Sequence, residues 1–163
     1  MARRFIIDSL KYWFNEYHVD GFRFDLMGVY DIYTVKKIRS ELDKIDPSII
    51  MYGEGWSGGT TQLVPENSAL KANGPKFGKS QVAMFSDDLR DGLKGHVFTE
   101  NAPGYINGKE DLEDTIKFGI VASTQHDGID YSKVNYSKEA WANEPYQTIN
   151  YVTSHDNLSL IHI

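Results

Sequence analysis

The sequence predicts an α/β fold, built around a parallel sheet, that forms part of a (β/α)8 TIM barrel. Two observations predict it: helical and strand-like patterns alternate along the chain, and each apolar strand leads into a cluster of polar side chains. Barrel enzymes carry their catalytic residues at the C-terminal ends of several strands, and a closed barrel needs about 250 residues. This chain has 163 residues. We therefore expect residues 1–163 to form one partial barrel domain.

The first half of the chain alternates helix, strand, helix and strand. Residues 4–17 and 31–45 carry apolar side chains at helical spacing. The two stripes consist of Ile6, Leu10, Trp13, Phe14 and Tyr17, and of Val35, Ile38, Leu42 and Ile45. Short apolar runs predict strands at 21–25 and 49–52, the second of them bounded by Pro47 and Gly53. This order is typical of βαβ units.

The second half has weaker patterns. We expect strands at 81–85 and 148–152, a short helix that ends near Gly95, and a helix at 110–123. Ile50 and Val152 are expected on inward faces of their strands. Two long polar segments, at 55–80 and 124–147, separate the elements. Loops of this length in compact domains are usually functional.

Composition excludes several classes of protein. The formal net charge is −6 and the basic residues are not clustered, which disfavours nucleic acid as a partner. Cysteine is missing, so disulfides and thiolate metal sites are excluded. No apolar run approaches the about 20 residues of a membrane span, and the N-terminal residues do not have the pattern of a signal peptide. Neither a calcium loop nor a glycine-rich phosphate loop is present, so we expect no metal and no cofactor.

The stretch 20–25 holds the first candidate site. Strand side chains alternate, so Phe22 and Phe24 point one way while Arg23 and Asp25 point the other. An arginine and an aspartate are costly to bury on such a strand unless they pair or act chemically. A structural ion pair and a catalytic carboxylate account for this stretch equally well. Segments 51–56 and 151–157 favour catalysis, because each is another short apolar run that leads to a carboxylate.

These three stretches resemble the signature regions of the α-amylase family of glycoside hydrolases. By this resemblance, Asp25 is the nucleophile and Glu54 is the general acid/base. Asp156, together with His155, binds the sugar ring and stabilises the transition state. Three such motifs in the order of the family are much more specific than one.

Four segments together narrow the resemblance to the type I pullulanases within this family: 25–28 and 52–56, which overlap the first two motifs, and 85–91 and 147–152. The likeness extends from Arg4 onward and implies that the chain holds strands four to seven of the barrel with their helices. It also implies retaining cleavage of α-1,6-glucosidic links in pullulan or branched α-glucans, through a covalent glycosyl-enzyme intermediate. The first three strands of the family, its last strand and its first signature motif have no counterpart in the sequence.

The chemistry requires different surroundings for the two carboxyl groups. Arg23 lies on the same strand face as Asp25 and favours the ionised carboxylate that a nucleophile needs. Glu54 has to hold a proton, and Trp56 or Tyr52 would supply a less polar setting. Arg23, Trp56 and His155 are the candidate substrate-binding residues, although Trp56 is equally well explained as a core residue.

One acidic segment has two interpretations. Asp87, Asp88 and Arg90 follow the third strand, where they would line a cleft or cap the short helix, and capping is favoured.

The predicted function is therefore debranching of an α-glucan, with alternatives left open. Within the same family, isoamylase, glycogen-debranching or neopullulanase-type specificity fits the motifs as well. From another class, the chain would be an inactive half-barrel that binds sugar or self-associates through unpaired strand edges. A Rossmann-type cofactor domain shares the βαβ order but lacks its glycine fingerprint. The compartment is not indicated.

Overall fold

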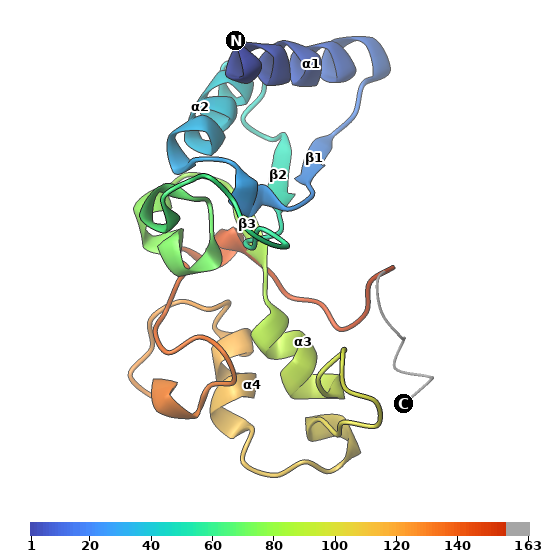
Figure 1. The fold of residues 1–163 in the computed structure, drawn as a ribbon, viewed down its shortest axis with the longest axis vertical. Helices are drawn as coiled ribbons and strands as arrows, with labels where there is room; N and C mark the ends of the chain where they lie inside the picture. Colours follow the sequence, from blue (N-terminus) through green and yellow to red (C-terminus); the bar gives the residue numbers. More distant parts are fainter. Residues whose placement is uncertain (156–163) are drawn as a thin grey trace. The chain divides into compact units, whose positions relative to one another are not determined.

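The computed structural model describes residues 1–155 and divides into two compact units. The first unit comprises residues 1–84, and the second begins at Phe85. Helices and strands alternate along the first unit, and its strands run parallel (Figure 1). The predicted α/β class with a parallel sheet is confirmed. That the whole chain forms a single domain stays a prediction.

The first unit is built on the predicted βαβ order. Helix α1 (Ala2–Tyr17) precedes strand β1 (Gly21–Phe24), and helix α2 (Ile32–Asp43) leads to strand β2 (Ile50–Gly53). The two strands pair in parallel, with Gly21 opposite Ile50 and Phe24 opposite Gly53. Strand β3 (Ala83–Phe85) lies on the other side of β2, where Tyr52 pairs with Ala83. The strand ends that carry Asp25 and Glu54 are thereby aligned.

Helix α2 supplies much of the core of this unit. Val35, Ile38 and Leu42 are buried as predicted. The helix begins where the Asp31 side chain accepts a hydrogen bond from Thr34 N at 2.8 Å, which satisfies one of the free N–H groups of the first turn. Ile45, predicted in the same stripe, is exposed because the helix ends at Asp43 and the chain leaves the helical path.

Arg39 lies on α2 but is buried despite its charge. Its side chain is only 1% exposed, and its guanidinium donates to the Ile49 carbonyl and pairs with Asp43 at 2.8 Å. A buried charge is tolerated when it is paired and hydrogen-bonded. Arg39 therefore fastens α2 to the segment that enters β2.

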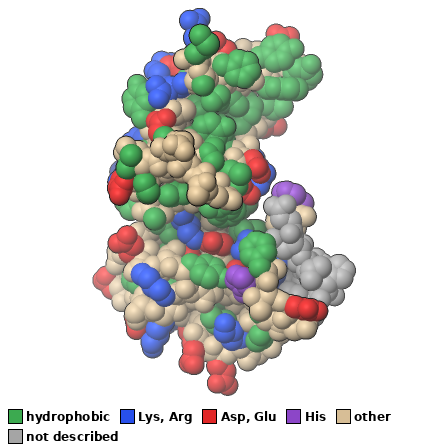
Figure 2. All heavy atoms as spheres, in the orientation of Figure 1, with side chains coloured by type: hydrophobic (Ala, Val, Ile, Leu, Met, Phe, Trp, Pro, Cys, Tyr) green, Lys and Arg blue, Asp and Glu red, His purple; other side chains and the backbone are tan. Residues whose placement is uncertain are grey.

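Helix α1 is formed as predicted, but none of its residues is buried. Trp13 and Tyr17 of the expected apolar stripe are 46% and 57% exposed, and their rings pack against each other with centroids 4.5 Å apart. Figure 2 shows hydrophobic side chains gathered over this helix. Periodicity predicted the helix correctly, and its apolar stripe is half-buried at Ile6, Leu10 and Phe14. Ile50, expected to face inward on β2, is exposed as well.

The long segment 55–80 is tied to the sheet rather than loose. It contains two 3-10 helices, Pro65–Asn67 and Lys71–Phe77. Lys71 N donates to Gly55 O at 2.8 Å, and Ala69 N donates to Tyr30 O at 2.9 Å. These backbone bonds place the segment directly after the ends of β1 and β2.

The second unit holds helix α3 (Asp87–Lys94), helix α4 (Glu113–Ile120) and strand β4 (Thr148–Ile149). Ile149 O accepts from Ser86 N at 3.0 Å, next to the end of β3. Helix α4 is shorter than predicted because Ala122 and Ser123 have positive φ angles of 53° and 59°, which end a right-handed helix. Strand β4 has two residues where five were expected, and Val152 is only half-buried.

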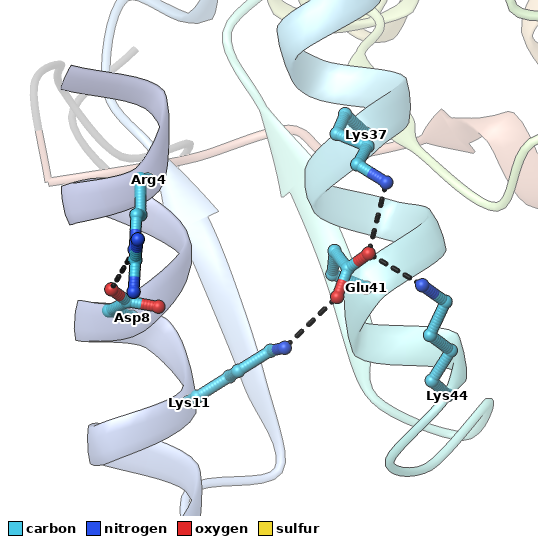
Figure 3. A network of polar contacts seen from close by, with 6 residues as sticks. All are labelled: Arg4, Asp8, Lys11, Lys37, Glu41 and Lys44. Atoms are coloured by element: carbon cyan, nitrogen blue, oxygen red, sulfur yellow. Dashed lines mark hydrogen bonds and ion pairs between the residues drawn. The ribbon is translucent and has the colours of Figure 1, made fainter. Parts of the chain in front are cut away.

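A cluster of three lysines around Glu41 joins α1 to α2 (Figure 3). Glu41 contacts the ammonium groups of Lys44 at 2.6 Å, Lys11 at 3.0 Å and Lys37 at 3.0 Å. Hydrogen bonds from Lys44, Lys11 and Lys37 lower the pKa of Glu41 from 4.5 to about 2. Because this folded-state pKa lies below the unfolded value, the stabilisation is complete above about 4.5 and is lost as the pH falls through about 2.

Replacing Glu41 by glutamine is expected to lower the thermal midpoint at neutral pH by a few degrees at most, because ion pairs whose lysine partners reach the solvent contribute little. The substitution also leaves three cations close together. The difference between parent and variant should shrink as the pH falls from 4.5 towards about 2. Thermal unfolding followed by circular dichroism measures it. Asp8→Asn, which removes the exposed pair with Arg4, is the control and should change little. A Glu41 effect that is the same at every pH would contradict this account.

Candidate active site

Strands β1 and β2 pair in parallel, and the two predicted catalytic carboxylates follow their neighbouring C-terminal ends. Phe24 O accepts from Glu54 N at 3.1 Å, so the parallel pairing continues one residue beyond β2. Phe24 is buried, whereas Arg23 and Asp25 on either side of it are exposed, as the predicted alternation requires. Gly53 allows this close approach: a Cβ atom there would lie 2.6 Å from Phe24 O.

Arg23 connects the two carboxylates. Its Nη1 donates to Asp25 Oδ1 at 2.7 Å, and its Nη2 donates to Glu54 Oε1 at 2.7 Å. The sequence predicted the first contact but not the second. Because one planar guanidinium spans both carboxylates, Asp25 and Glu54 lie within reach of the same small group. The chain thus brings together the predicted nucleophile, the predicted acid/base and the predicted Arg23.

The two carboxyl groups differ strongly in burial. The Asp25 side chain is 71% exposed, and the Glu54 side chain is 8% exposed. An exposed carboxylate is available to a ligand, whereas a buried one is held in a fixed position by its neighbours. Because the two carboxyl groups differ in exposure to water, one can act as a nucleophile and the other as an acid.

Glu54 has a second described donor that the sequence did not predict. Leu26 N donates to Glu54 Oε2 at 2.7 Å, so each Glu54 oxygen accepts one described hydrogen bond. Leu26 adopts a left-handed conformation, with φ 43° and ψ 50°, which is uncommon for a residue other than glycine. Nothing in the residue types signals this contact, because the donor is a backbone group.

The turn after β1 is locked against the turn after β2. Gly28 N donates to Trp56 O at 3.0 Å, and a Cβ atom at Gly28 would lie 2.6 Å from that carbonyl oxygen. Only glycine permits this approach of two backbones. Gly28 lies in the 3-10 helix Met27–Val29, which forms this turn. Trp56 is half-buried, and its stacking on a sugar stays a prediction.

The third predicted motif belongs to the second unit. His155 is exposed and is the last described residue. Asp156, the predicted transition-state stabiliser, lies outside the described residues. The roles assigned to His155 and Asp156 therefore stay predictions.

The acidic segment after β3 does not cap its helix in the way predicted. The cap is Ser86, whose side chain accepts from Leu89 N, and Asp88 lies in the first turn. Asp88 is fully buried and accepts hydrogen bonds from Tyr136 N at 2.8 Å, Ser137 N at 3.0 Å and Ser137 Oγ at 2.6 Å. It therefore fastens the loop at 136–137 to α3.

The neighbouring residues of α3 form a second buried polar group. Arg90 Nε contacts Asp91 Oδ1 at 2.5 Å, and Arg90 Nη1 donates to Tyr151 OH at 2.7 Å. Tyr136 OH donates to Asp91 Oδ2 at 2.7 Å. Burial, together with this bond to Asp91, raises the pKa of the Tyr136 phenol. Arg90 thus supports the chain four residues before His155.

Asp88→Asn is expected to lower the free energy of unfolding by about 1–3 kcal/mol, because an amide places a donor where the buried carboxylate meets N–H and O–H donors. Urea unfolding, read by the tyrosine and tryptophan fluorescence, measures it. Asp127→Asn, at an exposed position of the same unit, is the control. An unchanged urea midpoint for Asp88→Asn would show that the bonds to residues 136 and 137 contribute nothing to stability.

Among residues 1–155, no cluster of three or more histidine, aspartate or glutamate side chains could hold a metal ion. Within the same residues, none of the helices has both the length and the apolar character needed to cross a membrane.

Comparison with known proteins assigns the chain to a class by similarity. No protein-family model matches it. Sequence and structure comparisons nevertheless agree: over nearly all of its length, the chain is similar to glycoside hydrolases of the pullulanase type, which confirms the predicted resemblance.

Two of the relatives are bacterial pullulanases. The chain is 39% identical to the pullulanase of Bacillus subtilis (strain 168) over 157 aligned residues. This alignment covers 96% of this chain and 20% of that protein. It is 36% identical over 166 residues to pullulanase A of Streptococcus pneumoniae serotype 4, and this alignment covers 100% of this chain and 12% of that protein.

Solved structures give the same result. Pullulanase from Paenibacillus barengoltzii, in complex with maltohexaose and α-cyclodextrin, matches with a TM-score of 0.82 and 44% identity, over 97% of this chain and 23% of that one. Type I pullulanase of Bacillus subtilis, complexed with maltose, matches with a TM-score of 0.85 and 38% identity, over 98% of this chain and 21% of that one. The chain spans about a fifth or less of the length of the curated relatives named above.

Proposed function

We propose that this chain is a segment of the catalytic (β/α)8 barrel of a debranching glycoside hydrolase, corresponding to strands four to seven. Its substrate would be pullulan or a branched α-glucan, cleaved at α-1,6-glucosidic links with retention of configuration. The observation that carries the proposal is the Arg23 guanidinium, which hydrogen-bonds Asp25 and Glu54 at 2.7 Å each. Similarity to pullulanases, some of them solved with maltooligosaccharides, supports the substrate class.

The residues suit a two-step reaction. Asp25, exposed at the end of β1, attacks the anomeric carbon while the bond from that carbon to the glycosidic oxygen breaks. Glu54 gives its proton to the leaving oxygen and becomes a carboxylate. In the second step, Glu54 takes a proton from water, and the water oxygen displaces Asp25 from the anomeric carbon. Arg23 orients both carboxylates and stabilises their negative charge.

Substrate contacts are proposed for the remaining site residues. His155 and Asp156 would hold ring hydroxyls and strengthen those contacts in the transition state, as the resemblance to the family implies. Trp56 would offer an aromatic face to a glucose ring. Pullulanase-type specificity is preferred to isoamylase-type specificity, because the maize isoamylase SU1 is 28% identical to the chain whereas the pullulanase of Bacillus subtilis is 39% identical.

Release of reducing sugar from pullulan tests the proposed function. The assay is run on the 163-residue chain and on the complete barrel that the proposal requires, with unbranched amylose as the control substrate. We expect the complete barrel to act on pullulan and not on amylose, and the chain alone to show weak activity or none. Retention of configuration is followed by proton NMR of the first product. Inversion, or a preference for amylose, would refute the proposal.

We propose in addition that the chain by itself associates with further copies. Among residues 1–155, β1 is an edge strand that is paired on one side, and such edges attract other strands. Trp13 and Tyr17 add an exposed apolar surface on α1. Light scattering should give a mass well above the 18.5 kDa of one chain. The double substitution Trp13→Ser and Tyr17→Ser should shift it towards the monomer. A monodisperse parent monomer would refute the proposal.

A further inference from the structure

The backbone of Leu26 has an unusual conformation next to Glu54. Leu26 lies between the predicted nucleophile and a turn whose backbone is held in place: Val29 N donates to Leu26 O and Tyr30 N donates to Met27 O, both at 3.0 Å. At φ 43° and ψ 50°, Leu26 directs its N–H towards Glu54 Oε2, 2.7 Å away. A leucine in this conformation persists only where the surroundings enforce it.

The side chain of Leu26 helps to enforce that conformation. It lies against Gly58 in the segment that follows β2: a Cβ atom at Gly58 would come within 2.8 Å of Leu26 Cδ2. The segment after β1 and the segment after β2 therefore contact each other at Leu26 and Gly58 and at Gly28 and Trp56. In this arrangement the described hydrogen bond of Leu26 N is the one to the Glu54 carboxylate.

The hydrogen bonds of Glu54 leave room for a proton. A carboxylate offers about four acceptor positions, two on each oxygen. Leu26 N occupies one position on Oε2, and Arg23 Nη2 occupies one on Oε1. Either oxygen can thus carry the proton while both described bonds persist. Both donors form stronger hydrogen bonds to a carboxylate than to a neutral acid.

We propose that Leu26 is a positioning residue for the general acid. Its backbone N–H fixes the Glu54 carboxyl group in the orientation that delivers a proton to the glycosidic oxygen, and it stabilises the carboxylate formed in that step. This inference rests on the proposed function of Glu54. It differs from a structural role of the turn, because only the acid-dependent step should respond to loss of the N–H.

The first experiment tests the contact without any need for turnover. In the 163-residue chain, amide NMR signals of Leu26 and Tyr30 are compared between parent and Glu54→Ala. We expect the Leu26 amide proton to move upfield and to exchange faster with solvent in the variant, because it loses a charged acceptor. Tyr30 N, which donates to Met27 O in the same turn, should not change. An unchanged Leu26 signal overturns the inference, whatever the activity of the protein.

The second experiment tests the consequence in the complete active barrel. Leu26 is replaced by its α-hydroxy acid, which exchanges the backbone N–H for an ester oxygen and keeps the side chain. We expect kcat on pullulan to fall about 10- to 100-fold, the equivalent of one hydrogen bond to a charged group, with KM little changed. On an α-glucoside whose leaving group needs no protonation, the fall should be less than about threefold.

The matched control is the same exchange at Tyr30, which removes a backbone bond of the same turn at 3.0 Å without touching Glu54. It should leave the ratio of the two kcat values as in the parent. The inference is overturned if the ester exchange at Leu26 lowers kcat equally on both substrates. It is also overturned if the exchange at Tyr30 lowers kcat on pullulan alone, because either result would give Leu26 a structural role. If the parent barrel hydrolyses neither substrate, the proposed function fails, and with it the role in acid catalysis, whereas the NMR comparison still decides the contact.

Discussion

Replacing Asp25 by asparagine should reduce hydrolysis of pullulan in the complete barrel by about 10⁴-fold or more, the scale of loss that follows removal of a central catalytic group. The amide is almost the same size as the carboxylate but cannot form the glycosyl-enzyme bond. Arg23 Nη1 would also lose its charged partner at 2.7 Å. The fold should survive, because the Asp25 side chain is 71% exposed.

Asp20→Asn is the matched control for this prediction. Asp20 precedes β1 at its other end, is exposed, and contributes its backbone carbonyl to the sheet through Ile50 N at 3.0 Å. Its substitution should leave kcat within about twofold of the parent. Single-turnover measurements add a second check: the parent should accumulate a covalent intermediate under rapid quench, and Asp25→Asn should not. Turnover of Asp25→Asn within tenfold of the parent would remove Asp25 from the role of nucleophile.

The sequence predicted most of the first unit because its patterns are local. The helices at α1 and α2 and the strands at β1 and β2 follow from apolar periodicity and from the breakers Pro47 and Gly53. The pairing of Arg23 with Asp25 follows from alternation on one strand. Each of these depends on residues within a few positions of one another, where spacing and geometry are directly linked.

The features that escaped prediction depend on register or on backbone conformation. The bond from Arg23 to Glu54 exists because Arg23 pairs with Tyr52 across the sheet, which no residue type reveals. The bond from Leu26 N requires a left-handed leucine, although glycine is the residue that normally signals this conformation. Asp88 was predicted to cap its helix, but it is buried against Tyr136 N, a partner 48 residues along the chain that no local pattern indicates.

The second unit was predicted less well for a related reason. Strand β4 is short and α4 ends early, and much of the rest consists of turns and 3-10 segments held by side-chain bonds. Such segments have no period to detect. The motif at 154–157 was indicated by a short apolar run that leads to a carboxylate and by the family resemblance, and the described chain ends at His155.

Glu54→Gln is the second substitution with a large expected effect, and its signature depends on the substrate. Turnover of pullulan should fall by about 10²- to 10⁴-fold, the usual contribution of general acid–base catalysis. Formation of the glycosyl-enzyme from a substrate with a very good leaving group should be nearly normal, because such a group departs without a proton. Hydrolysis of that intermediate should then be slow, since water loses its base.

The same substitution separates chemistry from positioning. Glutamine has a single acceptor oxygen, so it can accept from either Leu26 N or Arg23 Nη2, and the other of the two contacts at 2.7 Å is lost because an NH2 group then faces that donor. A small nucleophilic anion such as azide should restore turnover of the activated substrate, because it needs no base. Glu66→Gln, at an exposed position of the segment after β2, is the control and should behave as the parent. Equal losses on both substrates, without rescue by azide, would show that Glu54 only supports the structure of the site.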